Sequence, residues 1–169
     1  MMRNRFDQQL EQLHADLITM GGLCETAIAA AVDAATKGDG DMAKAAIADD
    51  SKIDEMERSI EHLCLKLLLQ QQPVAKDLRE ISAALKMISD MERIGDQASD
   101  IAEITRDIED SPVVSHVPIA EMARGTIGMV TDSVDSFVKR DLDLARSVYT
   151  SDDKVDALFE NVMSRDDRA

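Results

Sequence analysis

Carboxylate residues recur at helical spacing in two stretches of the chain. Asp50 and Asp54 are four residues apart, and Glu92 and Asp96 repeat that spacing later in the chain, with Asp100 one turn further on. Residues four apart lie on one face of a helix, so each pair presents two carboxylates on the same side. All-oxygen clusters are the preferred ligands of hard cations such as Mg²⁺, Mn²⁺ or Ca²⁺, and carboxylates also hold iron. The two pairs predict a metal-ion site between adjacent helices, and a solvated acidic face is the alternative.

The position of Glu92 in its helix favours the metal-site interpretation. Leu78 and Leu85 are seven residues apart on the face that is expected to look into the core, and Glu92 takes the next position in that register. A carboxylate at a core-facing position is unfavourable unless it is paired or bound to a metal ion. A bound cation would satisfy that requirement.

The chain offers no recognisable catalytic arrangement. It contains none of the glycine motifs that bind phosphates or present a nucleophilic serine, and no nucleophile has an orienting base beside it. A ferritin-like di-iron site needs two Glu-x-x-His pairs and further glutamates, and only Glu11 and His14 have this spacing. We therefore expect no catalytic residue and no enzyme activity.

Composition and apolar spacing predict an all-α fold. Aromatic residues make up 2% of the chain, and only seven Gly and three Pro interrupt it, which is unlike a β-protein. Apolar residues recur at alternating spacings of three and four, as on the buried face of a helix. This spacing predicts five helices, over residues 3–36, 41–70, 73–108, 119–140 and from 142 onward.

An internal repeat divides the chain into two units. At an offset of 102 residues, the Asp50-x-Lys52-x-Asp54 segment recurs as Asp152-x-Lys154-x-Asp156, in register with the preceding turn. We expect a first unit over residues 1–108, a linker over 109–118 and a second unit of two helices over 119–169. Nothing in the second unit corresponds to residues 68–107. Either the chain is truncated or a partner subunit supplies the missing helix.

The net charge of the chain indicates which classes of partner it can bind. The chain has 34 acidic and 19 basic residues, a net charge of −15, which disfavours nucleic acids and anionic membranes. Cations and basic protein surfaces are the expected partners.

The two cysteines show no metal-binding or disulfide pattern. We expect no apolar run of membrane-spanning length and no secretory signal, so the expected compartment is the cytoplasm.

Several segments resemble the PhoU family, whose members regulate phosphate-specific transport and the phosphate regulon. The resemblance rests on Asp50-Ser51-Lys52-Ile53-Asp54, on Gln72-Pro73-Val74-Ala75-Lys76-Asp77-Leu78-Arg79 and on Glu92-Arg93-Ile94-Gly95-Asp96, in this order and spacing. It implies tandem three-helix bundles related by a pseudo-repeat, with the second bundle truncated here. It also implies binding of several metal ions, often iron, by the paired carboxylate motifs of each repeat. The implied ligands are Asp50, Asp54, Glu92, Asp96 and Asp100 in the first unit, and Asp152 and Asp156 in the second.

The function implied by the resemblance is regulatory rather than enzymatic. Such proteins link the ATPase subunit of the phosphate ABC transporter to a sensor histidine kinase, restrain phosphate uptake and favour the signalling-off state when phosphate is plentiful. They reach the membrane only through these protein partners, and they form homodimers or higher oligomers. Two alternatives remain open: a helical carboxylate metal-binding protein, as in iron storage or a di-metal enzyme, and a structural adaptor without metal.

Overall fold

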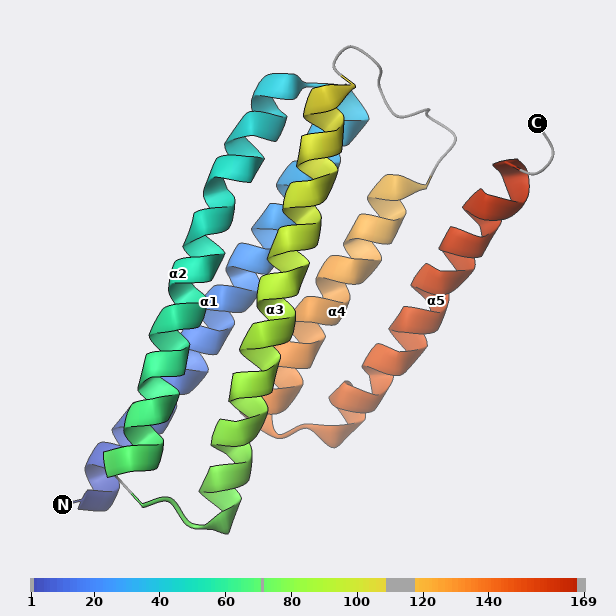
Figure 1. The fold of residues 1–169 in the computed structure, drawn as a ribbon. Coiled ribbons are helices and arrows are strands. Elements are labelled where there is room, and N and C mark those ends of the chain that lie inside the picture. The colour runs from blue at the N-terminus through green and yellow to red at the C-terminus, as the bar shows by residue number, and fades with distance from the viewer. Residues whose placement is uncertain (1, 71, 109–117, 167–169) are drawn as a thin grey trace.

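The computed structural model describes residues 2–70, 72–108 and 118–166. These residues form five α-helices and no strand, which confirms the all-α fold. Figure 1 shows the helices side by side, with successive helices running in opposite directions. Their bounds agree with the predicted segments to within two residues: α1 (Met2–Lys37), α2 (Gly40–Gln70), α3 (Ala75–Asp107), α4 (Ile119–Lys139) and α5 (Leu142–Asp166).

Local sequence signals explain where the helices begin and end. In the turn between α1 and α2, the carboxylate Oδ1 of Asp39 accepts hydrogen bonds from the backbone N–H groups of Asp41 (3.0 Å) and Met42 (3.1 Å), as an N-cap residue does. The expected start of α3 at Pro73 is wrong by two residues. Val74 has an extended backbone (φ −72°, ψ 165°), so the helix begins only at Ala75.

The first unit is a closed three-helix bundle of α1, α2 and α3. Leu17, Ile60 and Ile81, one from each helix, have no exposed surface. The predicted core seam of α3 is wrong at its start, because Leu78 is 48% exposed and the buried face runs instead through Ile81, Ile88 and Met91. Glu92 therefore lies beside the core face rather than in its centre, and its side chain is half-buried.

Helix α1 meets the length and composition of a membrane span over Asn4–Lys37, contrary to the expectation of no such apolar stretch. Its many Ala residues raise its mean hydropathy without making a wide apolar surface. The large apolar side chains Leu13, Leu17 and Met20 are fully buried against neighbouring helices. A core helix of a helical bundle passes the same test, and these buried side chains show that α1 is packed as a core helix in this structure.

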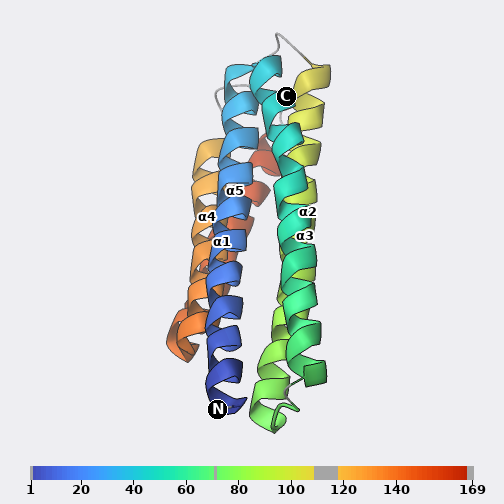
Figure 2. The same ribbon diagram turned by 90° about the vertical axis from the view of Figure 1, so that its left-hand side faces the viewer.

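The second unit begins with α4, which packs antiparallel against α1. The hydroxyl of Thr131 donates a hydrogen bond to the carboxylate of Glu25, and the rings of His14 and Phe137 meet edge to face with centroids 6.5 Å apart. Helix α5 makes close backbone approach only to α4 among the helices described. Figure 1 shows it set apart from α2 and α3, and in Figure 2 it lies behind α1. The expected linker lies outside the described residues, except for Pro118 at the start of α4.

A candidate metal centre between α2 and α3

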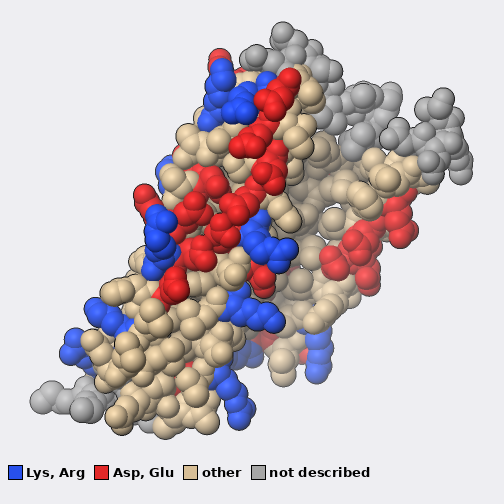
Figure 3. Space-filling view, viewed as in Figure 1, with Lys and Arg blue, Asp and Glu red and all other residues tan. Residues whose placement is uncertain are grey.

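The contact between α2 and α3 depends on a glycine. A Cβ atom added at Gly95 would lie 2.8 Å from Cδ1 of Ile53 and 3.2 Å from Oδ1 of Asp50. The absence of a side chain at this position therefore lets the two helices approach closely. Because carboxylates stand beside the glycine on both helices, the approach brings acidic side chains from α2 and α3 together. Figure 3 shows a band of acidic side chains running across α2 and α3 on the face toward the viewer.

Carboxylate oxygens gather here at distances suited to sharing cations. One oxygen from each of Asp50, Asp54 and Asp96 lies within 4.8 Å of the others. A second group of the same compactness consists of Asp54, Glu57 and Glu92. Asp54 belongs to both groups, so the cluster can hold two neighbouring ions that share one ligand residue. Oxygen-only ligand sets of this kind suit hard divalent cations and iron.

Hydrogen bonding, burial and electrostatic repulsion raise the pKa values of three carboxyl groups in this cluster. A hydrogen bond to Asp96, then burial, then the charges of Asp96, Glu57 and Asp54 raise the pKa of Glu92 to about 7. Burial, followed by the neighbouring carboxylates, also raises the pKa of Asp50 and of Glu57. A bound cation would replace the shared proton and remove the repulsion.

One oxygen of the cluster lacks a hydrogen-bonding partner. Oδ1 of Asp50 is buried and has no partner among the described residues. A buried carboxylate oxygen without a partner carries a desolvation penalty, and a metal ion supplies the missing interaction. The unpartnered oxygen, the compact geometry and the raised pKa values show that the residues present fit a metal ion.

The structure brings together four of the seven residues predicted as ligands. Asp50, Asp54, Glu92 and Asp96 meet at the α2–α3 contact. Asp100 lies one turn beyond; its charge contributes to the raised pKa of Asp50, but it joins neither oxygen group. Asp152 and Asp156 are exposed on α5 and belong to no such group in the described part of the chain.

Glu57 is a member of the cluster that the predicted ligand set did not include. Its spacing of three residues from Asp54 places it on the same side of α2 and makes it a candidate, but only the packing of α3 against α2 brings it together with Glu92. The Glu11–His14 pair does not form a site. His14 instead contacts the carboxylate of Glu80, which also accepts a 2.9 Å hydrogen bond from Nη2 of Arg140.

Comparison with known proteins places the chain among phosphate-transport proteins. A family model described as the PhoU domain matches residues 17–105 and 119–165. The phosphate-specific transport system accessory protein PhoU homolog of Clostridium acetobutylicum is 38% identical in an alignment 175 positions long, gaps included, that covers 98% of this chain and 80% of that protein. The accessory protein PhoU of Escherichia coli K12 is 33% identical over 94% of this chain; the chain spans 66% of its length.

Solved structures agree with the sequence comparisons. The crystal structure of PhoU from Pseudomonas aeruginosa superimposes with a TM-score of 0.86 at 33% identity, covering 95% of this chain and 78% of that one. The phosphate transport system regulatory protein PhoU from Streptococcus pneumoniae gives a TM-score of 0.83 at 25% identity, with 92% and 74% covered. The matched fold, the two matched segments and the identity along nearly the whole chain show that it belongs to the PhoU family.

Proposed function

We propose that this protein is a regulatory accessory protein of a phosphate transport system. It would bind the ATPase subunit of the transporter and a sensor histidine kinase from the cytoplasm, and would restrain phosphate uptake and starvation signalling. The observation that carries the proposal is identity of 33–38% with relatives named as accessory proteins of phosphate-specific transport. Those names describe accessory or regulatory proteins, and we propose a non-enzymatic role here too.

We further propose that the cluster between α2 and α3 holds metal ions as part of this role. Asp50, Asp54 and Asp96 would bind one ion, and Asp54, Glu57 and Glu92 a second. The ions would offset the charge of five carboxylates and link α2 to α3. The unpartnered oxygen of Asp50 supports this assignment beyond the clustering of charge.

Metal analysis of the purified protein tests the site. Glu92→Gln with Asp96→Asn keeps the side-chain shapes and removes two charges, and we expect bound metal, measured by mass spectrometry, to fall to background. Asp152→Asn with Asp156→Asn is the matched control, because it makes comparable changes on α5, and it should leave the metal content unchanged. Equal metal in the parent and the Glu92/Asp96 variant would contradict the site.

A complementation assay tests the regulatory role separately. In a host that lacks its own PhoU, the chain should restore repression of a phosphate-starvation reporter at high phosphate. A reporter that stays fully active, with the chain expressed and folded, would contradict the regulatory role. Full repression by the Glu92→Gln/Asp96→Asn variant would instead identify a structural adaptor that does not need its metal.

A further inference from the structure

The face of α2 and α3 that carries the acidic cluster becomes apolar toward the α2–α3 turn. On α2, Glu61 is followed seven residues later by Leu68. On α3, Glu92 is preceded at intervals of seven residues by Leu85 and Leu78. Residues seven apart lie nearly on one line along a helix. Because α2 and α3 are antiparallel neighbours, leucines of both helices lie on the half of this face that is nearer the turn.

Five leucines on this half of the face form what we call the leucine patch. Leu65 (46%), Leu69 (82%) and Leu78 (48%) are exposed. Leu68 and Leu85 are half-buried and pack against the core of the first unit, so the patch is continuous with that core. On α2 the three leucines are helical neighbours, at spacings of three and four. Single exposed apolar residues need no explanation, but several gathered on one face are typical of an interaction surface.

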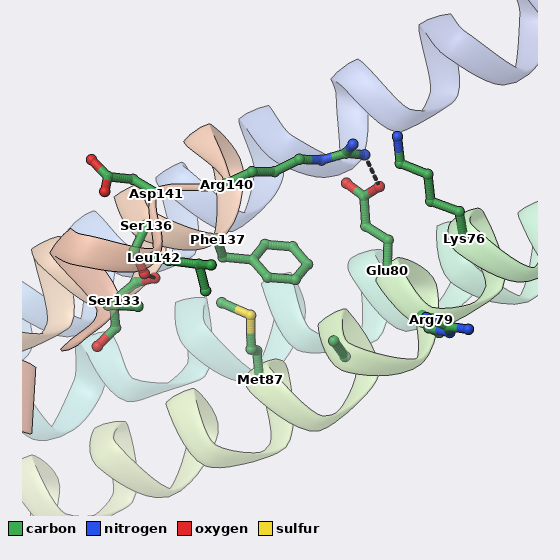
Figure 4. A pocket seen from close by; sticks show the side chains of 12 residues that line it. Lys76, Arg79, Glu80, Met87, Ser133, Ser136, Phe137, Arg140, Asp141 and Leu142 are labelled. Carbon is green, nitrogen blue, oxygen red and sulfur yellow. Dashed lines mark hydrogen bonds and ion pairs between the residues drawn. The ribbon is translucent and has the colours of Figure 1, made fainter.

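The leucine patch is separate from the cavity of about 720 Å³ that lies between α3, α4 and α5. That cavity is lined by Lys76, Arg79 and Met87 of α3 and by residues such as Phe137 and Arg140 (Figure 4). None of the five leucines lines it. Among the helices described, α2 makes close backbone approach only to α1 and α3. The patch is therefore a surface of the first unit alone.

Basic side chains border the leucine patch on both helices. On α2, Arg58 lies seven residues before Leu65, and Lys66 follows that leucine directly. On α3, Lys86 follows Leu85. All three basic side chains are exposed and form no ion pair with any described carboxylate. Figure 3 shows uncharged surface beyond the acidic band, with basic side chains at its edges. This half of the face is therefore locally basic, although the chain carries a net charge of −15.

An apolar surface with basic edges fits an amphipathic helix with acidic flanks. Such a helix can place its apolar side chains on the leucines and its carboxylates beside Arg58, Lys66 and Lys86. A second copy of this chain fits less well, because it would bring the same basic edges against these. An anionic membrane also fits less well, because the carboxylates of this face begin at Glu61, about 10 Å from Leu68 along the helix, and would be pressed against like charge.

We propose that the leucine patch is a docking surface for another protein, which binds to it through an acidic amphipathic helix. The helix lies along the contact between α2 and α3, on the half of the face nearer the turn. Glu61 and the acidic cluster beyond it limit the contact at the other end, because they repel the carboxylates of the bound helix. The proposal depends neither on metal binding nor on the regulatory role.

Two fluorescent peptides of about three heptads each test the proposal on the full chain. Both carry leucine at the a and d positions; one has glutamate at e and g, and the other has lysine there. Fluorescence anisotropy at about 0.15 M salt, where charges are screened beyond about 8 Å, measures the two Kd values. We expect the acidic peptide to bind at least about tenfold more tightly than the basic one, although the net charge of −15 favours the basic one.

Two variants each remove one part of the docking surface. Leu69→Ser with Leu78→Ser removes exposed apolar side chains, and Lys66→Glu with Lys86→Glu reverses the charge of the edges. Each variant should bind the acidic peptide at least about tenfold more weakly than the parent does. All four side chains are exposed, so both variants should keep parent-like helicity by circular dichroism.

Matched controls make the same kinds of change elsewhere. Tyr149→Ser with Phe159→Ser removes exposed apolar side chains of α5. Lys37→Glu with Lys44→Glu reverses two exposed charges beside the α1–α2 turn. Both controls should bind the acidic peptide as the parent does. A loss as large as that of the patch variants would show that binding follows general hydrophobicity or charge, and would contradict the proposal.

Three outcomes would overturn the proposal: no binding of the acidic peptide up to about millimolar concentration, equal or tighter binding of the basic peptide, or patch variants that bind as the parent does. A dimer of the parent that the patch variants lose would assign the patch to a second copy. Phosphatidylserine vesicles that bind the parent but not the variants would assign it to a membrane. Either of these results would also contradict the proposal.

Discussion

Asp50 and Asp54 on α2 have the same sequence pattern as Asp152 and Asp156 on α5, yet their surroundings differ. The first pair faces α3, and the close approach at Gly95 brings further carboxylates against it. The second pair lies exposed on a helix that, among the helices described, packs on α4 alone. The same pattern therefore makes a candidate metal centre only where a third helix supplies the other ligands.

The contrast extends from the carboxylates to the packing of the two units. In the first unit, every helix contacts both others and the large core side chains are fully buried. In the described part of the second unit, the most buried apolar residues belong to α4, and α5 contributes only half-buried ones. Stability should therefore be concentrated in α1, α2 and α3, with α5 opening more easily.

Truncation of a core leucine in each unit should give the largest difference. Leu17→Ala removes a fully buried side chain of α1 and should lower the free energy of unfolding by about 2–5 kcal/mol. Leu158→Ala on α5 removes a half-buried side chain and should lower it by only about 1 kcal/mol. Urea denaturation followed by circular dichroism measures both, and equal losses would contradict the contrast between the units.

Valine substitution at Gly95 and at Gly125 compares the α2–α3 contact with the α4–α5 contact. Gly95→Val forces new methyl groups against Ile53 and Asp50, and should destabilise the protein by about 1–3 kcal/mol and lower its metal content. A Cβ at Gly125 would meet only Val155, at 2.8 Å. Because α5 is held by α4 alone, it can shift, so Gly125→Val should cost less than about 1 kcal/mol. A larger loss at Gly125 than at Gly95, again by urea denaturation, would reverse the comparison.

The pH dependence of stability should distinguish the acidic cluster from the acids of α5. The pKa of Glu92 is raised to about 7 in the folded protein, whereas an unfolded glutamate titrates near about 4.3. Between these values the folded state retains a proton that the unfolded state has lost. The contribution of Glu92 is therefore fully present below about pH 4.3 and disappears as the pH rises through about 7.

Metal-free protein should accordingly lose stability as the pH rises from about 4.3 to about 7. The raised pKa values of Asp50 and Glu57 change stability with pH in the same direction. Glu92→Gln keeps a hydrogen-bond donor at all pH values and should flatten the dependence, whereas Asp156→Asn should leave it unchanged. Thermal melting of the chelator-treated proteins measures the slopes. Parallel curves for the parent and Glu92→Gln would show that Glu92 does not hold the proton.

Sequence periodicity predicted the helices well because helix faces and turn residues are local features. The four-residue spacing likewise identified Asp50, Asp54, Glu92 and Asp96, since each pair lies within one helix. The rotation of one helix against another is not local. It decides that Glu57 joins the cluster and that Leu78 lies outside the core, and neither outcome follows from spacing alone.

The spacing of residues in the sequence could not predict the contacts between the two units either. The placement of α4 against α1 depends on small and polar groups distant in sequence, such as Thr131 and Glu25. Glu80, with contacts to His14 on α1 and Arg140 after α4, has no sequence pattern that marks it as a link between three segments. The cavity of about 720 Å³ beside α4, lined by side chains such as Met87 and Phe137, follows from this placement, so it too required the structure.

Cysteine labelling compares how readily the two units open locally. Burial raises the pKa of Cys24 to about 12 and of Cys64 to about 11, and neither thiol has exposed surface. Because only an exposed thiolate reacts readily with iodoacetamide, both should label only when the first unit opens. A third cysteine, introduced as Val148→Cys on α5, should label much faster. One rapid and two slow adducts by mass spectrometry would show that α5 opens more readily than the first unit. Equally rapid adducts would show that the first unit is not more closed than α5.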